Sequence, residues 1–274
     1  MSSRADRFVE RSVSSSSGPI APLNTMESFF SNEVFLEEAL SFAGVDAEYV
    51  IGRAMPAVKR AAGNGVLRRL NLTEEEALVI AAYTVEGRPG SLSMYDALNR
   101  TLRETRDPRS MKRIRMLLVI FLRALRKLPL VEKDRVYRGI DVNLGPSLKS
   151  GSTVTWWGFT SVTWNAEITN TFVGRTGGSL FQIEGSCKGY DISELSVFPA
   201  ESELLIEPET RIKINAVIKM GASASMMQCS IEPSELILQR VVQSNGKKSG
   251  GGGIVQPVSM PLKIGGCAEN IGSS

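Results

Sequence analysis

The chain changes character near residue 130, and this change constrains its fold more than any other feature of the sequence. Before that point, apolar residues recur every three or four positions, which is the spacing of an amphipathic helix. After it come short runs of β-branched and aromatic residues, separated by Gly, Pro, Asn and Ser. Helices followed by strands predict an α+β fold, in which an N-terminal helical part packs on a mostly antiparallel β-sandwich.

The same patterns predict the domain organisation and the elements. The sequence divides into a disordered Ser-rich leader (1–24), a helical part (25–130), a β-rich core (131–243) and a flexible Gly-rich tail (244–274). Thr73 with Glu76 three residues later predicts a capping box. Helices are expected over 26–42, 47–69 (broken at Pro56 and at 63–65), 73–83, 94–103, 109–130 and 165–172. Strands are expected over 135–140, 152–163, 178–184, 187–192, 201–206, 211–219 and 236–242.

Composition excludes several classes of function. The chain has no histidine, which excludes His-based catalytic triads, His-containing zinc sites and His general bases. Cys187, Cys229 and Cys267 are isolated, and no secretory signal is visible, so we expect a reduced cytoplasmic protein. Alternatively, the Ser-rich leader is the export signal of an injected effector. A net charge of +3 predicts no nucleic-acid partner, and the apolar run 116–122 is too short for stable membrane insertion.

Two carboxylates lie close together around residue 203. Side chains alternate between the faces of a strand, so Glu201 and Glu203 are expected to point the same way, while Leu204 and Ile206 face the core. Like charges about 7 Å apart repel by roughly 2 kcal/mol at an effective dielectric near 20. Such a pair costs little when both acids are solvated, and it is useful when positive charge develops between them. This stretch alone favours two solvated acids.

Two further pieces of the β-rich core carry groups suited to a ligand. Arg138 is expected on a strand and is followed by Gly139. A guanidinium can bind phosphate or carboxylate through two hydrogen bonds, and glycine lets a ligand approach the backbone. Residues 156–163 place aromatic side chains before hydroxyls, among them Ser161, which can orient a carboxylate. Each piece alone is more often ordinary strand packing.

Together and in this order, the pieces resemble the R-S-E class of mono-ADP-ribosyltransferases, which includes cholera-toxin-like and clostridial toxins and vertebrate ecto-enzymes. The matching residues are Arg138 on the first strand, Phe159-Thr160-Ser161-Val162-Thr163 on the second and Glu201-Ser202-Glu203 on the third. Val162 and Thr163 depart from the family's aromatic-x-Ser-Thr-Ser pattern, whereas Ser161, its first serine, is kept. The resemblance covers roughly residues 72–220 and implies a core of the ADP-ribosyltransferase type. The diphtheria-toxin and poly-ADP-ribose polymerase branch requires a histidine that this chain lacks.

The resemblance implies an arginine-specific mono-ADP-ribosyltransferase that uses NAD as substrate and needs no metal. Its acceptor would be an arginine of a protein. Glu203 would stabilise the positive charge that develops on the ribose as nicotinamide leaves, and Ser161 would hydrogen-bond Glu203. Glu201 would orient the attacking guanidinium.

The resemblance also implies the contacts that hold NAD. Arg138 would grip the phosphate and the nicotinamide ribose, and the backbone of Gly139 would meet the carboxamide. The Gly-rich loop that begins at Phe172 and carries Arg175 lies where the family covers the NAD phosphates.

Other functions are compatible with parts of this pattern. An NAD glycohydrolase would use the same residues with water as the acceptor. A catalytically silent binding protein on this fold is disfavoured because the set Arg138, Ser161, Glu201 and Glu203 is intact. An ordinary glycosidase would place its carboxylates across a sugar cleft, not side by side on one strand.

Overall fold

The structure is a computed structural model that describes residues 35–104, 108–140, 142–165 and 177–232. The predicted leader, the tail, the helix after residue 165 and the strand over 236–242 lie outside these ranges. The helices are α1 (Leu36–Phe42), α2 (Ala47–Gly63), α3 (Val66–Leu70), α4 (Glu74–Tyr83), α5 (Met94–Glu104) and α6 (Pro108–Leu125). The strands are β1 (Leu130–Ile140), β2 (Thr153–Trp156), β3 (Thr160–Thr163), β4 (Gly178–Asp191), β5 (Glu203–Ile206), β6 (Thr210–Met220) and β7 (Ala224–Glu232), and a 3₁₀ helix, η4 (Pro199–Glu201), precedes β5.

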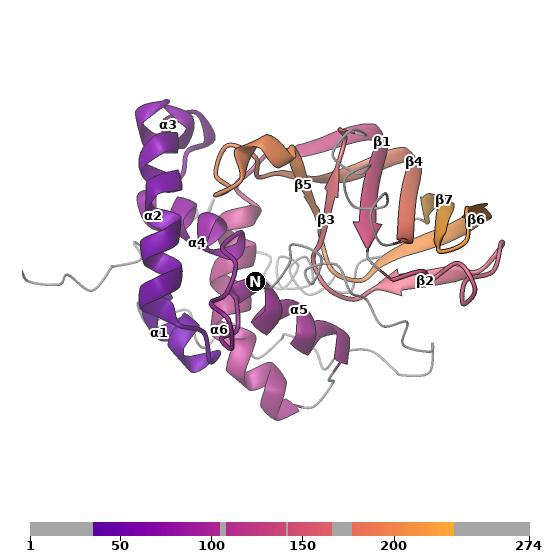
Figure 1. Ribbon diagram of the computed structural model, residues 1–274. Helices are drawn as coiled ribbons and strands as arrows, with labels where there is room; N and C mark the ends of the chain where they lie inside the picture. Colours follow the sequence, from indigo (N-terminus) through magenta and orange to yellow (C-terminus); the bar gives the residue numbers. More distant parts are fainter. Residues whose placement is uncertain (1–34, 105–107, 141, 166–176, 233–274) are drawn as a thin grey trace, which may run out of the picture.

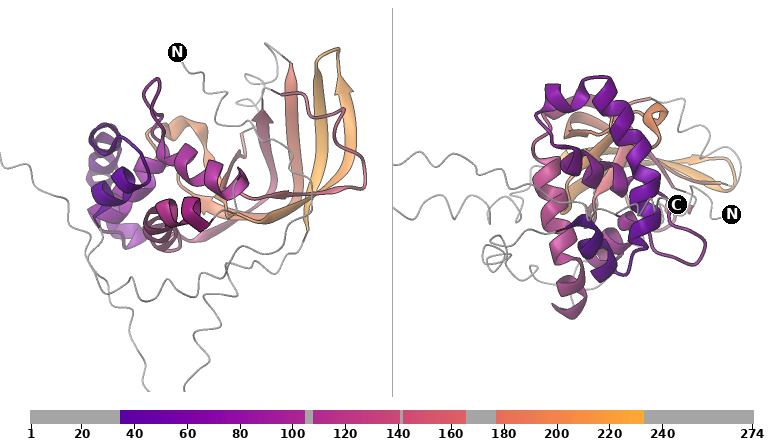
Figure 2. Two further views of the ribbon diagram at one scale, coloured as in Figure 1. Left: turned by 90° about the horizontal axis from the view of Figure 1, so that it is seen from below. Right: turned by 90° about the vertical axis from the view of Figure 1, so that its left-hand side faces the viewer.

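The helices gather on one side of the molecule and the strands on the other (Figures 1 and 2). All described α-helices precede all described strands in the sequence, which confirms the predicted α+β order, and only the short 3₁₀ helix η4 lies among the described strands. Within the described ranges, no helix is both long enough and apolar enough to cross a membrane.

Helix α4 lies at the centre of the helical part. Its residues 77–83 are all buried, and a helix that is apolar all round belongs in a core. The predicted capping box is present, since Thr73 Oγ1 accepts from the Glu76 amide and Glu76 accepts from the Thr73 amide. The break predicted at Pro56 is wrong, because α2 continues through it with Ala54 and Ala57 buried on either side. Packing of the apolar face has overridden the helix-breaking tendency of proline.

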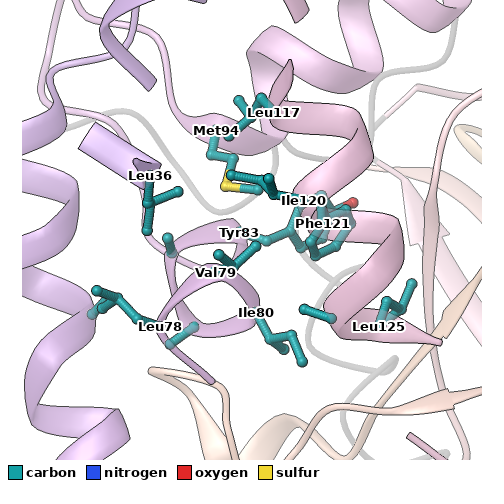
Figure 3. Close-up of a cluster of buried hydrophobic side chains, with 14 of the residues drawn as sticks. Leu36, Leu78, Val79, Ile80, Tyr83, Met94, Leu117, Ile120, Phe121 and Leu125 are labelled. Carbon is teal, nitrogen blue, oxygen red and sulfur yellow. The ribbon is translucent and has the colours of Figure 1, made fainter. Parts of the chain in front are cut away.

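Two aromatic rings, Tyr83 and Phe121, lie among aliphatic side chains in the helical core (Figure 3). Tyr83 of α4 stacks on Phe121 of α6 with ring centroids 4.6 Å apart. Phe159, which precedes β3, packs edge-on against Phe121 at 4.9 Å. Residues of the β-rich core therefore enter the helical core, and four of them belong to it: Phe159, Ile192, Leu195 and Leu205.

The strands form a seven-stranded sheet in the order β1-β3-β5-β4-β7-β6-β2, with β1 also paired to β4. The pairings are antiparallel except that of β4 with β7, which is parallel. A second apolar core lies among these strands. It takes residues from each of them: Val136, Ile140, Trp156, Val162, Phe181, Ile183, Cys187, Leu204, Ile206, Ile212, Ile214, Met227 and Cys229.

The observed strands differ in detail from the predicted ones. The runs 178–184 and 187–192 are one long strand, β4, which continues through Gly185 at φ +86°. The run 152–163 is two strands, because β2 pairs with β6 whereas β3 pairs with β5. Strand β7 was not expected, since its sequence ASMMQCSIE contains one β-branched residue, Ile231.

A partly buried ion pair joins the end of the last helix to the sheet. Arg126, just after α6, donates from Nε and Nη2 to both carboxylate oxygens of Glu207, each at 3.0 Å. The hydroxyl of Tyr190 on β4 donates to the same carboxylate at 3.0 Å. A bidentate pair with a third donor fixes both partners, so the helical part and β5 keep one relative position.

Candidate active site

Three of the predicted site residues meet on adjacent strands. Glu203 on β5 lies opposite Thr163 on β3, and Ser161 is its diagonal neighbour on the same face. The hydroxyl of Ser161 donates to Glu203 Oε1, which is the hydrogen bond that the family resemblance implies. Arg138 on β1 donates from Nη1 to the Ser161 carbonyl at 3.0 Å. Strand pairing thus brings Arg138, Ser161 and Glu203 into one hydrogen-bonded group.

Both charged residues of this group are nearly removed from water. Arg138 is 2% exposed and Glu203 is 6% exposed. Charges are rarely buried unless they are paired or have a function, because their transfer from water is costly. The Arg138 guanidinium also lies 5.5 Å from the centre of the Trp156 ring, which is within the range of a cation–π contact. The site therefore holds both charges in fixed positions before any substrate arrives.

Glu201 is not on the strand, and the alternation argument for the two acids is wrong. It ends the 3₁₀ helix η4, and Ser202 follows in the left-handed conformation at φ +47° before β5 begins at Glu203. Glu201 is half-buried and Glu203 buried. All of β5 is buried, so its two faces do not divide into a core side and a wet side. The two carboxylates lie in different surroundings.

The other predicted NAD-binding residues are only partly described. Gly139 is buried on β1, where it pairs with Leu180 of β4. Phe172 and Arg175 lie outside the described residues, so their predicted contact with the NAD phosphates stays a prediction.

A buried amide behind the site was missed by the sequence reasoning. Asn99 of α5 is fully buried, and its Oδ1 accepts from the Phe159 amide at 2.7 Å. Its Nδ2 donates to the Tyr83 hydroxyl at 3.0 Å. A Cβ on Gly158 would lie 2.6 Å from Asn99 Oδ1, so only glycine allows this approach. Asn99 thus fixes the start of β3, two residues before Ser161. In the sequence, the feature that points to Asn99 is a polar amide side chain on the apolar face of a predicted helix.

The Tyr83 hydroxyl that Asn99 contacts belongs to a neutral phenol. Burial raises the pKa of Tyr83 well above its ordinary value, and the charges of Tyr95 and Glu203 raise it further. The phenol is therefore neutral over the whole physiological pH range.

Comparison with known proteins agrees with this geometry. The chain matches the family model described as NAD:arginine ADP-ribosyltransferase over residues 56–232, which is more than half its length. A sequence comparison with curated proteins finds no match.

Among the solved structures that share the fold are Vis and ART2.2. Vis, a toxin of Vibrio splendidus solved in complex with the inhibitor M6, has a TM-score of 0.50 and 21% identity over 69% of this chain and 87% of Vis. The eucaryotic mono-ADP-ribosyltransferase ART2.2, as a point mutant in complex with NADH, has a TM-score of 0.50 and 20% identity over 78% of this chain and 89% of ART2.2. The family match spans β1, β3 and β5, which carry Arg138, Ser161 and Glu203. The chain therefore belongs to the NAD:arginine ADP-ribosyltransferase family, whose members transfer ADP-ribose from NAD to arginine.

Proposed function

We propose that the chain breaks the nicotinamide N-glycosidic bond of NAD with Glu203, Ser161 and Arg138, and that the acceptor is an arginine of a protein. The observation that carries this assignment is the hydrogen-bonded group of these residues on β1, β3 and β5. Its two charges are buried, which is the arrangement that an electrostatically stabilised reaction requires.

Glu203 supplies the negative charge for bond breaking. Departure of nicotinamide leaves positive charge on the ribose, and a carboxylate beneath such a sugar stabilises it. Because Glu203 is only 6% exposed, water screens this interaction little. Ser161 donates to one carboxylate oxygen and so fixes the side chain in one orientation. We assign the second oxygen, Oε2, to the contact with the ribose of NAD.

Arg138 supplies a planar cation for the phosphate of NAD. Its Nη1 is held by the Ser161 carbonyl and its guanidinium lies against Trp156, so the fork has a fixed direction. A lysine ammonium has the charge but not the fork.

Replacement of Arg138 by Lys is therefore expected to weaken NAD binding about 10- to 100-fold, the usual effect of losing a charge-assisted hydrogen bond. Calorimetric titration with NAD measures this change. The matched control is Arg135→Lys, which alters an exposed arginine on the same strand and should leave the affinity unchanged. Equal affinities of Arg138→Lys and wild type would remove Arg138 from the NAD site.

The acceptor side is assigned to Glu201. Its position at the end of η4, outside the buried group, suits a carboxylate that orients an incoming guanidinium. The alternative is an NAD glycohydrolase, in which water takes the place of arginine and Glu203, Ser161 and Arg138 keep their roles.

Incubation with labelled NAD tests the proposed function. The wild-type protein should release nicotinamide and transfer label to agmatine, a small guanidine, and to arginines of proteins in a cell lysate. Mapping of the labelled residues identifies the acceptor. Release of free ADP-ribose with no labelled guanidine would show a glycohydrolase instead.

A further inference from the structure

The turn between β4 and β5, residues 192–202, is built into the helical part. Connecting segments usually run over the surface. Here Ile192 and Leu195 are buried within the helical core, and Ser196 has no exposed surface. In Figure 1 the orange turn that precedes β5 reaches away from the sheet toward α2, α3 and α4. The base of this turn is therefore a part of the helical core.

Two helical residues hold the base of the turn by hydrogen bonds. Arg60 of α2 donates from Nη2 to the carbonyl of Ser196 at 2.6 Å. Thr84, at the end of α4, accepts from the amide of Val197 through Oγ1 at 3.0 Å and donates to the carbonyl of Ala81 at 2.8 Å. Thr84 is buried. If its hydroxyl were removed, the Val197 amide would therefore lose a hydrogen-bond acceptor that water does not readily replace.

The far end of the turn is exposed and leads to Glu201. Pro199 and Ala200 are exposed, whereas Glu201 is half-buried. The amide of Phe198 donates to Ser196 Oγ at 3.0 Å, and the amide of Glu201 donates to the carbonyl of Phe198 at 3.1 Å. Local hydrogen bonds therefore connect residues 196 and 197, which the helices hold, to Glu201, the carboxylate assigned to the acceptor.

We propose that Thr84 and Arg60 are positioning residues for the acceptor step. They hold the base of the turn so that Glu201 meets the incoming guanidinium in one place. This inference rests on the proposed function, because it concerns the acceptor that Glu201 orients. The side chains that act on NAD are held by the contacts among Arg138, Ser161 and Glu203. The turn meets this group through the backbone, where the amide of Ile192 donates to the carbonyl of Glu203 at 3.2 Å, and this contact does not involve residues 196 and 197. Loosening the turn should therefore impair use of the acceptor and leave NAD cleavage intact.

Steady-state kinetics of Thr84→Val and Arg60→Met test the proposal. Valine keeps the shape of threonine but removes the hydroxyl, and methionine keeps most of the arginine stem but removes the donor. The KM for agmatine should rise about 5- to 30-fold, which is the usual range for one lost hydrogen bond. Nicotinamide release without an acceptor should stay within about twofold of wild type. Thr84→Ser, which keeps the hydroxyl, should restore the wild-type KM, and Arg135→Met, at an exposed pair with Glu184, should leave it unchanged.

The outcomes separate this inference from the proposed function. An unchanged KM for agmatine in both variants, or an equal loss of transfer and hydrolysis, overturns the positioning role. If Thr84→Val does not fold, Arg60→Met decides alone, since Arg60 is exposed on α2. If the wild type modifies agmatine and both variants do so with an unchanged KM, only this inference is contradicted. A wild type that cleaves NAD but leaves agmatine unmodified contradicts the proposed function, and the positioning role falls with it.

Discussion

Replacement of Glu203 by Gln is expected to abolish both ADP-ribose transfer and NAD hydrolysis, with rates falling on the order of a hundredfold or more. Glutamine has nearly the same shape, and its carbonyl oxygen can still accept from Ser161. The variant therefore removes the negative charge and little else. Nicotinamide release and agmatine modification, measured on the same preparation, give the two rates.

The fold should survive this change, which separates a catalytic loss from a structural one. Glu203 carries its charge at 6% exposure, and burial of a charge costs stability. The melting temperature of Glu203→Gln should accordingly equal or exceed that of wild type. Glu132→Gln, at an exposed carboxylate of β1, is the control that should alter neither rate nor melting temperature. Near-native turnover of Glu203→Gln would overturn the assignment of the bond-breaking acid.

Replacement of Glu201 by Gln is expected to separate the two reactions. Transfer to agmatine should fall about 10- to 100-fold, because the guanidinium loses a charged hydrogen-bond partner. NAD hydrolysis should stay within about threefold of wild type, because Glu203, Ser161 and Arg138 still form their group. The measurement compares nicotinamide release with agmatine modification side by side.

The matched control is Glu194→Gln, at an exposed carboxylate of the same turn, which pairs with Arg69 on the surface. Exposed pairs contribute little, so both activities should persist in this variant. If Glu201→Gln loses hydrolysis as well as transfer, Glu201 belongs to the bond-breaking group. If it loses neither, arginine is not the acceptor that this carboxylate orients.

The part of the site that could be predicted from sequence is the part that lies on regular strands. Arg138, Ser161 and Glu203 were singled out by residue type and order, and strand pairing brings them together. Glu201 was placed wrongly because a Glu-x-Glu pattern does not reveal that the central residue, Ser202, is left-handed. Local backbone conformation decided its position, not the period of a strand.

The contacts of the turn could not be predicted, because they join residues remote in the sequence. Arg60 and Ser196 are 136 positions apart, and Thr84 and Val197 are 113 apart. No periodicity relates such positions, and each residue alone looks like an ordinary helix surface or helix end. The capping box of α4 was predicted correctly for the opposite reason, since Thr73 and Glu76 are three residues apart.

The helical core contains side chains from both the helical part and the β-rich core, and this limits how the enzyme could be cut into fragments that fold. Phe159, Ile192, Leu195 and Leu205 come from the β-rich core and are buried among the helices. A fragment that starts at residue 131 would expose these side chains to water and would lose Asn99, which fixes the start of β3. The change of character at residue 130 is therefore a boundary between kinds of secondary structure and not between cooperative folding units. Neither half can be exchanged with that of a relative unless the residues at this shared core are exchanged with it.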